Sequence, residues 1–389
     1  MKKIYICADR RFPHGDAGGN RIEYMARCAQ SRGVQPIVIS MGTDEEGNNG
    51  ELLRDYQGIM YRNVALKRGK LGFVQQYFYL GKQVGQILRT IEIEIGSVVV
   101  LYSSNPIFCT QVRKEIPDHC KVVYDVVEWF DASCYKYGRI DPRFWVFQWC
   151  FEGVYPKGDG IIAISKNIER HFLGLNKKVI RFPICLDVDR FACVEHKTQY
   201  DRIRLIYPGN PQNKDDVRTM LKALLHLDKE DLNRIEFHFT AVKKETIKII
   251  LGEDAGVLSE LRSNVVFHEW MTYDELLRLY GGMDALYMLR LDNLVTKSNF
   301  PSKVPELMSC GVTVIANDSG DFFEYLTDGI DAVKIETNDI DGCVEALKRY
   351  LSMDEAKKRQ MSEAAIRCAK EKFTYLEYAQ NLITYLEEL

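Results

Sequence analysis

The stretch FPSKVPELMSCGVTVIANDSGDFFEYLTDG, residues 300–329, decides the fold. Ser302 is a favourable N-cap, Pro305 is tolerated in a first turn and Gly311 can cap the other end, so a helix is predicted over 302–309. The run 312–316 that follows is apolar along its whole length, which is typical of a parallel strand covered by helices on both faces. A helix followed at once by such a strand is the repeating unit of an α/β domain.

The same pattern extends along the chain in both directions. Apolar runs predict strands at 4–8, 36–40, 98–102, 122–125 and 160–164 in the first half, and at 205–207, 235–239, 265–267, 285–288 and 332–335 in the second. Apolar residues at helical spacing separate them, for example over 20–32, 216–227 and 273–280. The predicted fold class is therefore α/β, with two Rossmann-like, doubly wound domains in tandem.

A polar, proline-bearing segment at 181–197 separates the two arrays of strands. We place an N-terminal domain at 1–182 and a C-terminal domain at 183–374. The tail has apolar residues on one helical face, and a last helix within 375–389 is expected to cross back onto the first domain. Because ligands bind beyond the carboxyl ends of parallel strands, we expect the two domains to face a central cleft.

Composition excludes several classes of protein. The chain has 389 residues, and its 52 Lys+Arg nearly balance its 55 Asp+Glu, which argues against nucleic acid as the main partner. The sequence contains no run of about 18 apolar residues, so no transmembrane helix is predicted. The 11 cysteines are odd in number and form no CxxC pair, so neither a zinc ribbon nor a disulfide framework is indicated. These features predict a reducing, cytoplasmic location.

The loop after the first strand contains Gly18, Gly19 and Asn20. The glycine pair allows close backbone approach and Asn20 can cap the next helix, an arrangement that suits an anion such as a phosphate. The alternative is a flexible turn with an ordinary cap. The loop is not the GxGxxG of a dinucleotide site, which disfavours a dehydrogenase.

Two loops of the second half carry cations beside helix starts. Gly209 ends a strand and Lys214 precedes a helix, where a lysine can reach a phosphate or remain a solvated surface lysine. At 302–309 the amides of Lys303 and Val304 are expected to be free, at the positive end of the helix dipole. Glu306, one turn later, is placed to accept hydrogen bonds from a ribose diol. One helix thus offers an anion site and a diol acceptor, which matches a nucleoside diphosphate.

These motifs resemble family 4 of the GT-B glycosyltransferases, the group that includes many enzymes of bacterial surface-polysaccharide synthesis. Residues 300–329 are similar to the nucleotide-sugar motif of the family, and YPGNPQNKDD at 207–216 is similar to its phosphate loop. Residues 12–33, 160–172 and 181–191 are similar to its N-terminal glycine loop, the end of its first domain and its interdomain linker. The similarities span nearly the whole chain in the expected order.

The resemblance implies roles for individual residues. Lys214 and Lys303 would bind the donor diphosphate, Glu306 would hold the ribose, and Arg290 would add a phosphate or sugar contact. The remaining donor-binding positions that it implies are Gly18, Gly19, Asn20, Gly209, Asn210, Ser302 and Val304.

The sequence also departs from the family pattern. Family 4 usually carries two glutamates eight positions apart, but Ser298 stands where the first is expected, so donor sugar identity cannot be carried over. Asn210 and Pro211 replace the arginine expected beside the glycine of the phosphate loop. In the first domain, Asp125 and Glu128 are candidates to contact the acceptor, although an aspartate at a strand end is often structural.

The reaction implied is the transfer of a sugar from a UDP-sugar, or a GDP-sugar, to a glycan or lipid-linked glycan. It would retain anomeric configuration and need neither a metal nor another cofactor, with the two lysines and the helix start stabilising the leaving diphosphate. Basic, aromatic segments at 67–79 and 143–149 are candidates for peripheral contact with the inner face of the cell membrane, and the aromatics of the second are also typical of a core. The alternatives are a non-catalytic nucleotide-sugar-binding protein or a GT-B epimerase or phosphorylase.

Overall fold

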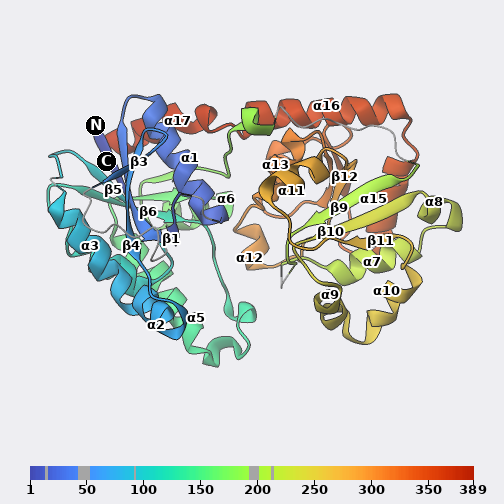
Figure 1. Cartoon of the computed structure of the whole chain (residues 1–389), viewed down its shortest axis with the longest axis horizontal. Helices are drawn as coiled ribbons and strands as arrows, with labels where there is room; N and C mark the ends of the chain where they lie inside the picture. The colour runs from blue at the N-terminus through green and yellow to red at the C-terminus, as the bar shows by residue number, and fades with distance from the viewer. Residues whose placement is uncertain (14–15, 43–52, 92, 192–200, 212–213) are drawn as a thin grey trace. The chain divides into compact units, whose positions relative to one another are not determined.

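The computed structural model describes residues 1–13, 16–42, 53–91, 93–191, 201–211 and 214–389 (Figure 1). The predicted linker at 181–197 therefore lies partly outside the described residues. Contacts divide the chain into unit 1, which is Met1–Leu186 with Tyr375–Leu389, and unit 2, which is Asp187–Thr374. The chain leaves unit 1 after Leu186 and enters it again at Tyr375, where the Tyr375 amide donates to the Leu186 carbonyl at 3.2 Å.

Unit 1 is built on an eight-stranded sheet of order β3-β4-β2-β1-β5-β6-β7-β8. All neighbouring strands pair in parallel except β3 and β4, which form an antiparallel hairpin. The strands are β1 (Lys3–Arg11), β2 (Gln35–Gly42), β3 (Arg54–Tyr56), β4 (Ile59–Ala65), β5 (Val98–Tyr102), β6 (Lys121–Val126), β7 (Gly160–Ala163) and β8 (Val179–Arg181).

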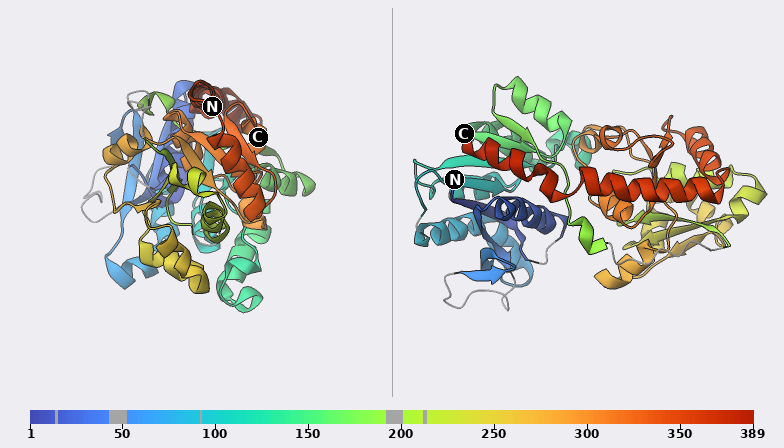
Figure 2. Two further views of the ribbon diagram at one scale, coloured as in Figure 1. Left: turned by 90° about the vertical axis from the view of Figure 1, so that its right-hand side faces the viewer. Right: turned by 90° about the horizontal axis from the view of Figure 1, so that it is seen from above.

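Helices cover both faces of this sheet. The chain moves one way across the sheet through α1 and the opposite way through α3, α4, α5 and α6, so right-handed crossovers place these two groups on opposite faces. The last helix, α17, packs against α1, as the right-hand view of Figure 2 shows. The helices are α1 (Ala17–Ser31), α2 (Gly69–Val74), α3 (Leu80–Thr90), α4 (Pro106–Arg113), α5 (Pro142–Gln148), α6 (Lys166–Gly174) and α17 (Tyr375–Glu387), with π-helical turns η1 (Gln75–Tyr79) and η4 (Trp149–Val154).

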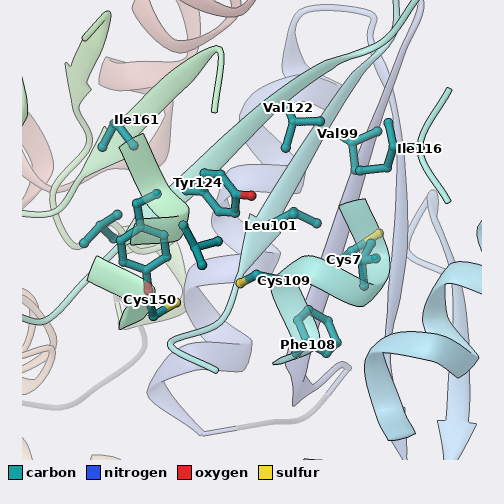
Figure 3. Packing of buried hydrophobic residues seen from close by; sticks show 14 of the residues in the cluster. Cys7, Val99, Leu101, Phe108, Cys109, Ile116, Val122, Tyr124, Cys150 and Ile161 are labelled. Atoms are coloured by element: carbon teal, nitrogen blue, oxygen red, sulfur yellow. The ribbon is translucent and has the colours of Figure 1, made fainter. Parts of the chain in front are cut away.

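The core of unit 1 lies between the sheet and the group of helices that contains α3 and α4 (Figure 3). Leu101 and Val122 from the strands meet Phe108 from α4 there. Cysteines pack within it as small apolar residues, and burial raises the pKa of the Cys7 thiol to about 12. The ten cysteines of the described residues are all free, as the sequence predicts.

Unit 2 repeats the plan with a six-stranded, all-parallel sheet of order β11-β10-β9-β12-β13-β14. Its strands are β9 (Ile203–Pro208), β10 (Ile235–Thr240), β11 (Val265–Phe267), β12 (Ala285–Met288), β13 (Thr313–Asn317) and β14 (Ala332–Ile335). Its helices are α7 (Val217–Leu225), α8 (Lys229–Asn233), α9 (Lys244–Leu251), α10 (Val257–Glu260), α11 (Tyr273–Tyr280), α12 (Leu294–Lys297), α13 (Lys303–Ser309), α14 (Phe322–Tyr325), α15 (Ile340–Leu351) and α16 (Glu355–Lys372).

The predicted α/β class and the two doubly wound sheets are confirmed, while three strands of unit 1 were not predicted. The hairpin of β3 and β4 lies at one edge of the sheet, where polar and apolar residues mix, and its two-residue turn places Gln57 and Gly58 at positive φ. The strand β8 includes Arg181, which the sequence had assigned to the linker. Among the described residues, no helix is long and apolar enough to span a membrane.

A pair of histidines, one buried and one half-buried, lies at one side of unit 2. His238 on β10 contacts His268 through Nδ1 and Nε2 at 2.8 Å, and its other nitrogen lies 2.9 Å from a Glu236 oxygen. The Arg204 guanidinium contacts the same carboxylate at 3.3 Å. Burial lowers the pKa of His238 to about 4, against the opposing effect of Glu236. The pKa values of His268 and Glu236 are lowered as well.

We expect this cluster to make stability depend on pH. The unfolded state binds a proton at His238 below about pH 6.5, whereas the folded state resists it down to about pH 4, so stability is full above this window and falls as pH drops through it. A shift of this size corresponds to a change in the free energy of unfolding of about 3 kcal/mol across the whole window. Urea unfolding at pH 5 and pH 7.5 measures the difference, and His238→Gln should reduce it. An equal pH dependence in the variant would contradict this prediction.

Candidate functional site

The carboxyl edge of the unit 2 sheet brings together the loops that the sequence singled out. Lys214 lies before α7, Arg290 lies just after β12, and Lys303 opens α13. An antiparallel bridge between Asp215 and Arg290 joins the first two loops, and the Leu291 amide donates to the Lys214 carbonyl at 3.0 Å. The loop that carries Lys214 is therefore fixed to the end of β12.

Arg290 is the centre of a buried polar network at this edge. Its guanidinium donates to Asp215 Oδ1 at 3.2 Å and to Asn299 Oδ1 at 3.0 Å, while its backbone amide donates to Asn317 Oδ1 at 2.9 Å. Tyr207 donates its hydroxyl to the other Asp215 oxygen at 2.5 Å. Burial lowers the pKa of Arg290 and raises the pKa of Asp215, and in each case the partner's charge opposes the shift.

This network changes the interpretation of Arg290. The sequence assigned it a direct phosphate or sugar contact, but its side chain is only 3% exposed and is held by two other residues. It joins the loop before α7, the end of β13 and the segment before α13. We therefore treat Arg290 as a residue that positions the candidate site. Its direct contact with a phosphate or sugar stays a prediction from the sequence.

The start of α13 carries the two opposite charges expected for donor binding. Lys303 Nζ lies 2.9 Å from Glu306 Oε2, with 38% of the lysine side chain and 8% of the glutamate side chain exposed. Ser302 occupies the N-cap position, but its side chain makes no capping hydrogen bond, and the Val304 amide donates to the Pro301 carbonyl at 3.2 Å. The expectation that Val304 presents a free amide is therefore wrong, because the turn before the helix uses it.

The second candidate phosphate loop begins at a glycine that its backbone requires. Gly209 follows β9 with φ of +95°, a conformation that side chains disfavour. Asn210 is exposed beside it, and Lys214 is half-buried. Residues 212–213 between them lie outside the described residues. Whether this loop binds a phosphate remains a prediction.

Sequence reasoning missed several polar groups of unit 2. Ser319, in the loop after β13, and Tyr280, at the end of α11, have buried hydroxyl groups without a partner among the described residues. Such groups lie in positions that a bound polar molecule or water would satisfy. Ser298, which replaces the expected first glutamate, is fully buried at the end of α12.

In unit 1 the candidate glycine loop already holds an anion of the protein itself. Asp16, not Asn20, is the N-cap of α1, and its carboxylate accepts from the amides of Gly18 at 3.0 Å and Gly19 at 3.3 Å. The predicted cap at Asn20 is therefore wrong. A Cβ on Gly19 would lie 2.5 Å from the Arg11 carbonyl oxygen, so packing of α1 against the end of β1 explains this glycine without a ligand.

The candidate acceptor residue Asp125 is fully occupied by an arginine. Its two oxygens accept from Arg21 Nε and Nη2, each at 2.7 Å, and both side chains are buried. Arg21 also donates to the carbonyls of Phe182 and Pro183. This geometry favours the structural alternative for Asp125. Glu128, just beyond β6, is half-buried, and its charge contributes to raising the pKa of Arg10.

A second polar cluster of unit 1 had no signal in the sequence. Asp9, near the end of β1, accepts from the Ser103 hydroxyl at 2.6 Å and from Arg10 Nη1 at 2.8 Å. Burial raises the pKa of Asp9, against the opposing effect of Arg10. Arg10, Asp16 and Glu128 thus lie at the carboxyl edge of this sheet, where ligands of doubly wound domains bind. In the described part of the chain, no group of three or more His, Cys, Asp or Glu side chains is arranged to hold a metal ion.

Comparison with known proteins bears on the fold and on the family that part of the chain resembles. Residues 220–384 match the model of a family described as glycosyl transferase-like. No curated protein matches the chain. Sucrose-phosphate synthase from Thermosynechococcus elongatus superposes with a TM-score of 0.74 at 12% identity, over 100% of this chain and 99% of that one.

Two further solved structures resemble the chain over almost its full length. A glycosyltransferase from Rickettsia africae has a TM-score of 0.68 at 15% identity, over 100% of this chain and 98% of that one. Anabaena HepE, solved in complex with UDP, has a TM-score of 0.67 at 12% identity, over 100% of both chains. At these identities the likeness shows the fold, which is that of the GT-B glycosyltransferases.

Replacing Arg290 should destabilise unit 2 strongly. In Arg290→Met the carboxylate of Asp215 and the amide oxygen of Asn299 lose their buried cation, and the free energy of unfolding should fall by about 3 to 5 kcal/mol. Denaturant unfolding followed by circular dichroism measures this change.

An exposed arginine provides the matched control. Arg143 pairs with Asp141 at 2.7 Å, but 70% of the arginine side chain is exposed, so Arg143→Met should leave the free energy of unfolding almost unchanged. Adding Asp215→Asn to Arg290→Met should restore part of the loss. Equal effects of the two arginine substitutions would refute the central position of Arg290.

Proposed function

We propose that the protein is a retaining glycosyltransferase that moves a sugar from a UDP-sugar, or a GDP-sugar, to a glycan or lipid-linked glycan in surface-polysaccharide synthesis. The glycosyl transferase-like match over 220–384 supports this proposal because it includes the whole of α13. The UDP complex of Anabaena HepE supports the choice of a uridine nucleotide. The proposed location is cytoplasmic, with peripheral contact at the inner face of the cell membrane.

The pairing of Lys303 with Glu306 is the observation that carries the proposal. The two charges satisfy each other at 2.9 Å. The lysine is the more exposed partner, so it can turn to a diphosphate while the glutamate, almost buried, stays in place to accept from ribose hydroxyls. Lys214, half-buried on the neighbouring loop, would supply the second cation.

The proposed reaction exchanges one bond at the anomeric carbon for another. The bond from that carbon to the diphosphate oxygen breaks as the acceptor oxygen bonds to the same face, and the acceptor proton passes to the leaving phosphate. Lys303 and Lys214 would stabilise the charge that develops on the diphosphate. This scheme uses no protein nucleophile and no metal.

The acceptor would bind at the carboxyl edge of the unit 1 sheet. Arg10 and Glu128 are two charged groups at this edge whose side chains are half-buried. Asp125 is better assigned to holding Arg21, because both of its oxygens accept from that guanidinium.

A second candidate function is nucleotide-sugar binding without catalysis. The buried Ser298 favours it, because the position of the expected first glutamate offers no carboxylate to a donor sugar. Turnover distinguishes the two: release of free nucleotide from a bound nucleotide sugar in the presence of acceptor occurs only in the transferase. An epimerase or phosphorylase would convert the sugar nucleotide or a glycan without transferring sugar to an added acceptor.

A thermal-shift screen is the first experiment. A ligand that binds the native state raises the melting temperature by mass action. We expect UDP or GDP and their sugar conjugates to raise it with and without EDTA, and NAD to have no effect. A cooperative melt with no shift at millimolar concentration of any of these nucleotides would refute the donor site.

Substitutions in α13 should weaken the nucleotide without unfolding the protein. Lys303→Ala and Glu306→Ala should each raise the dissociation constant of the nucleotide about tenfold or more, because each removes charge-assisted hydrogen bonds. Lys297→Ala is the matched control. Lys297 ends α12, the helix before α13, and forms an exposed ion pair with Asp292. Unchanged nucleotide affinity in both α13 variants, with the fold intact, would overturn the assignment.

A further inference from the structure

Large apolar side chains are exposed in two segments of unit 1 more than elsewhere. Of the eighteen large hydrophobic side chains that are exposed in the described residues, nine fall within 71–79 and 137–149. Six of these nine are aromatic: Phe73, Phe78, Tyr79, Tyr137, Trp145 and Trp149. Such concentration on a folded domain indicates an interaction surface.

The first segment runs through α2 and the π-helical turn η1. Leu71 and Phe73 are about two-thirds exposed, and Tyr79 is exposed at the start of α3. The surrounding sequence is basic: 56–91 contains six Lys or Arg residues and no Asp or Glu, in a chain whose net charge is −3. A pocket of about 440 Å³ lies beside these side chains, and Lys67, Tyr79 and Lys82 contribute to its lining.

The second segment runs from Tyr137 into α5 and η4. Its aromatic residues divide between two sides of the helix, with Phe144 and Phe147 buried and Trp145 and Trp149 exposed. The sequence suggested that the aromatics of 143–149 belong to the core, and this is correct for only two of the four. Ile140, just before α5, is 86% exposed.

The charge of the second segment is also positive. Lys136, Arg139 and Arg143 lie within 132–149, where Asp141 is the only acidic residue. The Asp141 side chain is buried and paired with Arg143.

Both segments lie at the same end of unit 1. The first follows β4 and the second follows β6, and these strands run in the same direction, so both segments begin at the carboxyl edge of the sheet. The turns η1 and η4 both pack against α4. Figure 1 shows α2 and α5 at this end of the unit. We call the exposed side chains of 67–79 and 137–149, with Lys82, the basic apolar edge.

We propose that the basic apolar edge binds the surface of an anionic lipid bilayer. Tyr and Trp favour the boundary between headgroups and acyl chains, and apolar side chains flanked by Lys and Arg bind anionic membranes by combining burial with electrostatic attraction. The pocket lined by Lys67 and Lys82 would receive an anionic phospholipid headgroup. The positive charge of both segments complements an anionic surface. A bilayer is favoured over an acidic protein because the exposed Trp and Tyr side chains of two separate segments suit the headgroup boundary.

This inference develops the peripheral-membrane part of the proposed function, and lipid binding itself needs no sugar transfer. Because the candidate acceptor residues lie at the same edge, membrane contact would hold that edge beside a lipid-linked acceptor. The test therefore measures lipid binding and nucleotide binding separately.

The experiment is co-sedimentation of the full chain with two kinds of vesicle. One contains phosphatidylcholine alone, and the other also contains about 30% phosphatidylglycerol, which is anionic. We expect binding only to the anionic vesicles, with a loss in high salt. Leu71→Ser/Phe73→Ser, Tyr137→Ser/Ile140→Ser and Lys67→Glu/Lys70→Glu should each lower the partition coefficient about tenfold.

Unit 2 supplies matched controls. Ile249 and Trp270 are 80% and 83% exposed, so Ile249→Ser/Trp270→Ser removes the same kind of surface elsewhere. Lys243→Glu/Lys244→Glu reverses two exposed charges at the start of α9. Neither control should change vesicle binding. Equal loss in a control pair and its test pair, equal binding to both vesicle types, or no binding by the native chain would overturn the proposal.

The two proposals fail separately. If the native chain binds anionic vesicles but no nucleotide shifts its melting temperature, the donor site is wrong and the membrane surface stands. If nucleotides shift it but vesicles do not bind, the membrane surface is wrong. The three test pairs should retain the nucleotide-induced shift of the native chain, because all of them lie in unit 1 and the donor residues lie in unit 2.

Discussion

Each unit of this protein contains a buried arginine that is held by a carboxylate and by uncharged oxygen acceptors. A guanidinium removed from water is tolerated only when carboxylates and carbonyls replace its hydration. In unit 1, Arg21 meets this demand with both oxygens of Asp125 and two carbonyls after β8. In unit 2, Arg290 meets it with Asp215 and Asn299. Both pairs lie at the carboxyl edge of a parallel sheet, so the same constraint that satisfies the cation fixes the loops there.

Fixed loops leave a small number of charges available for ligands. Lys303 of unit 2 and Arg10 of unit 1 each have one buried carboxylate neighbour, yet each keeps a third or more of its side chain exposed. The pairing fixes the position of each cation, and the exposure lets an incoming anion compete with the carboxylate. A rigid frame with a few exchangeable ion pairs is an arrangement in which binding needs little rearrangement of the backbone.

The sequence predicted those features that leave a pattern within a short stretch of residues, and it missed those that depend on contacts between distant residues. The strands at 98–102 and 265–267 and the helix at 273–280 were predicted with their observed bounds, because uniform apolar runs and helical spacing report burial directly. The hairpin of β3 and β4 had no such run. The pair of Arg21 with Asp125 joins residues 104 positions apart, which no local pattern reveals. At the start of α1, Asp16 and Asn20 are both good capping residues, and only the backbone distinguishes them. In the site, Lys303 and Glu306 could be found from one helical turn, whereas the fixed position of Arg290 could not.

The return of α17 to unit 1 sets an order for folding during synthesis. Unit 1 contains the first 186 residues and also residues 375–389, so α1 lacks one packing neighbour until translation has passed α17. Unit 2 consists of one continuous segment and needs no later residues. On the ribosome, all residues of unit 2 are therefore present before α17 is made, while unit 1 still lacks the contacts of α17 with α1. A chain stopped before Tyr375 would contain all of unit 2 but would lack one helix of unit 1.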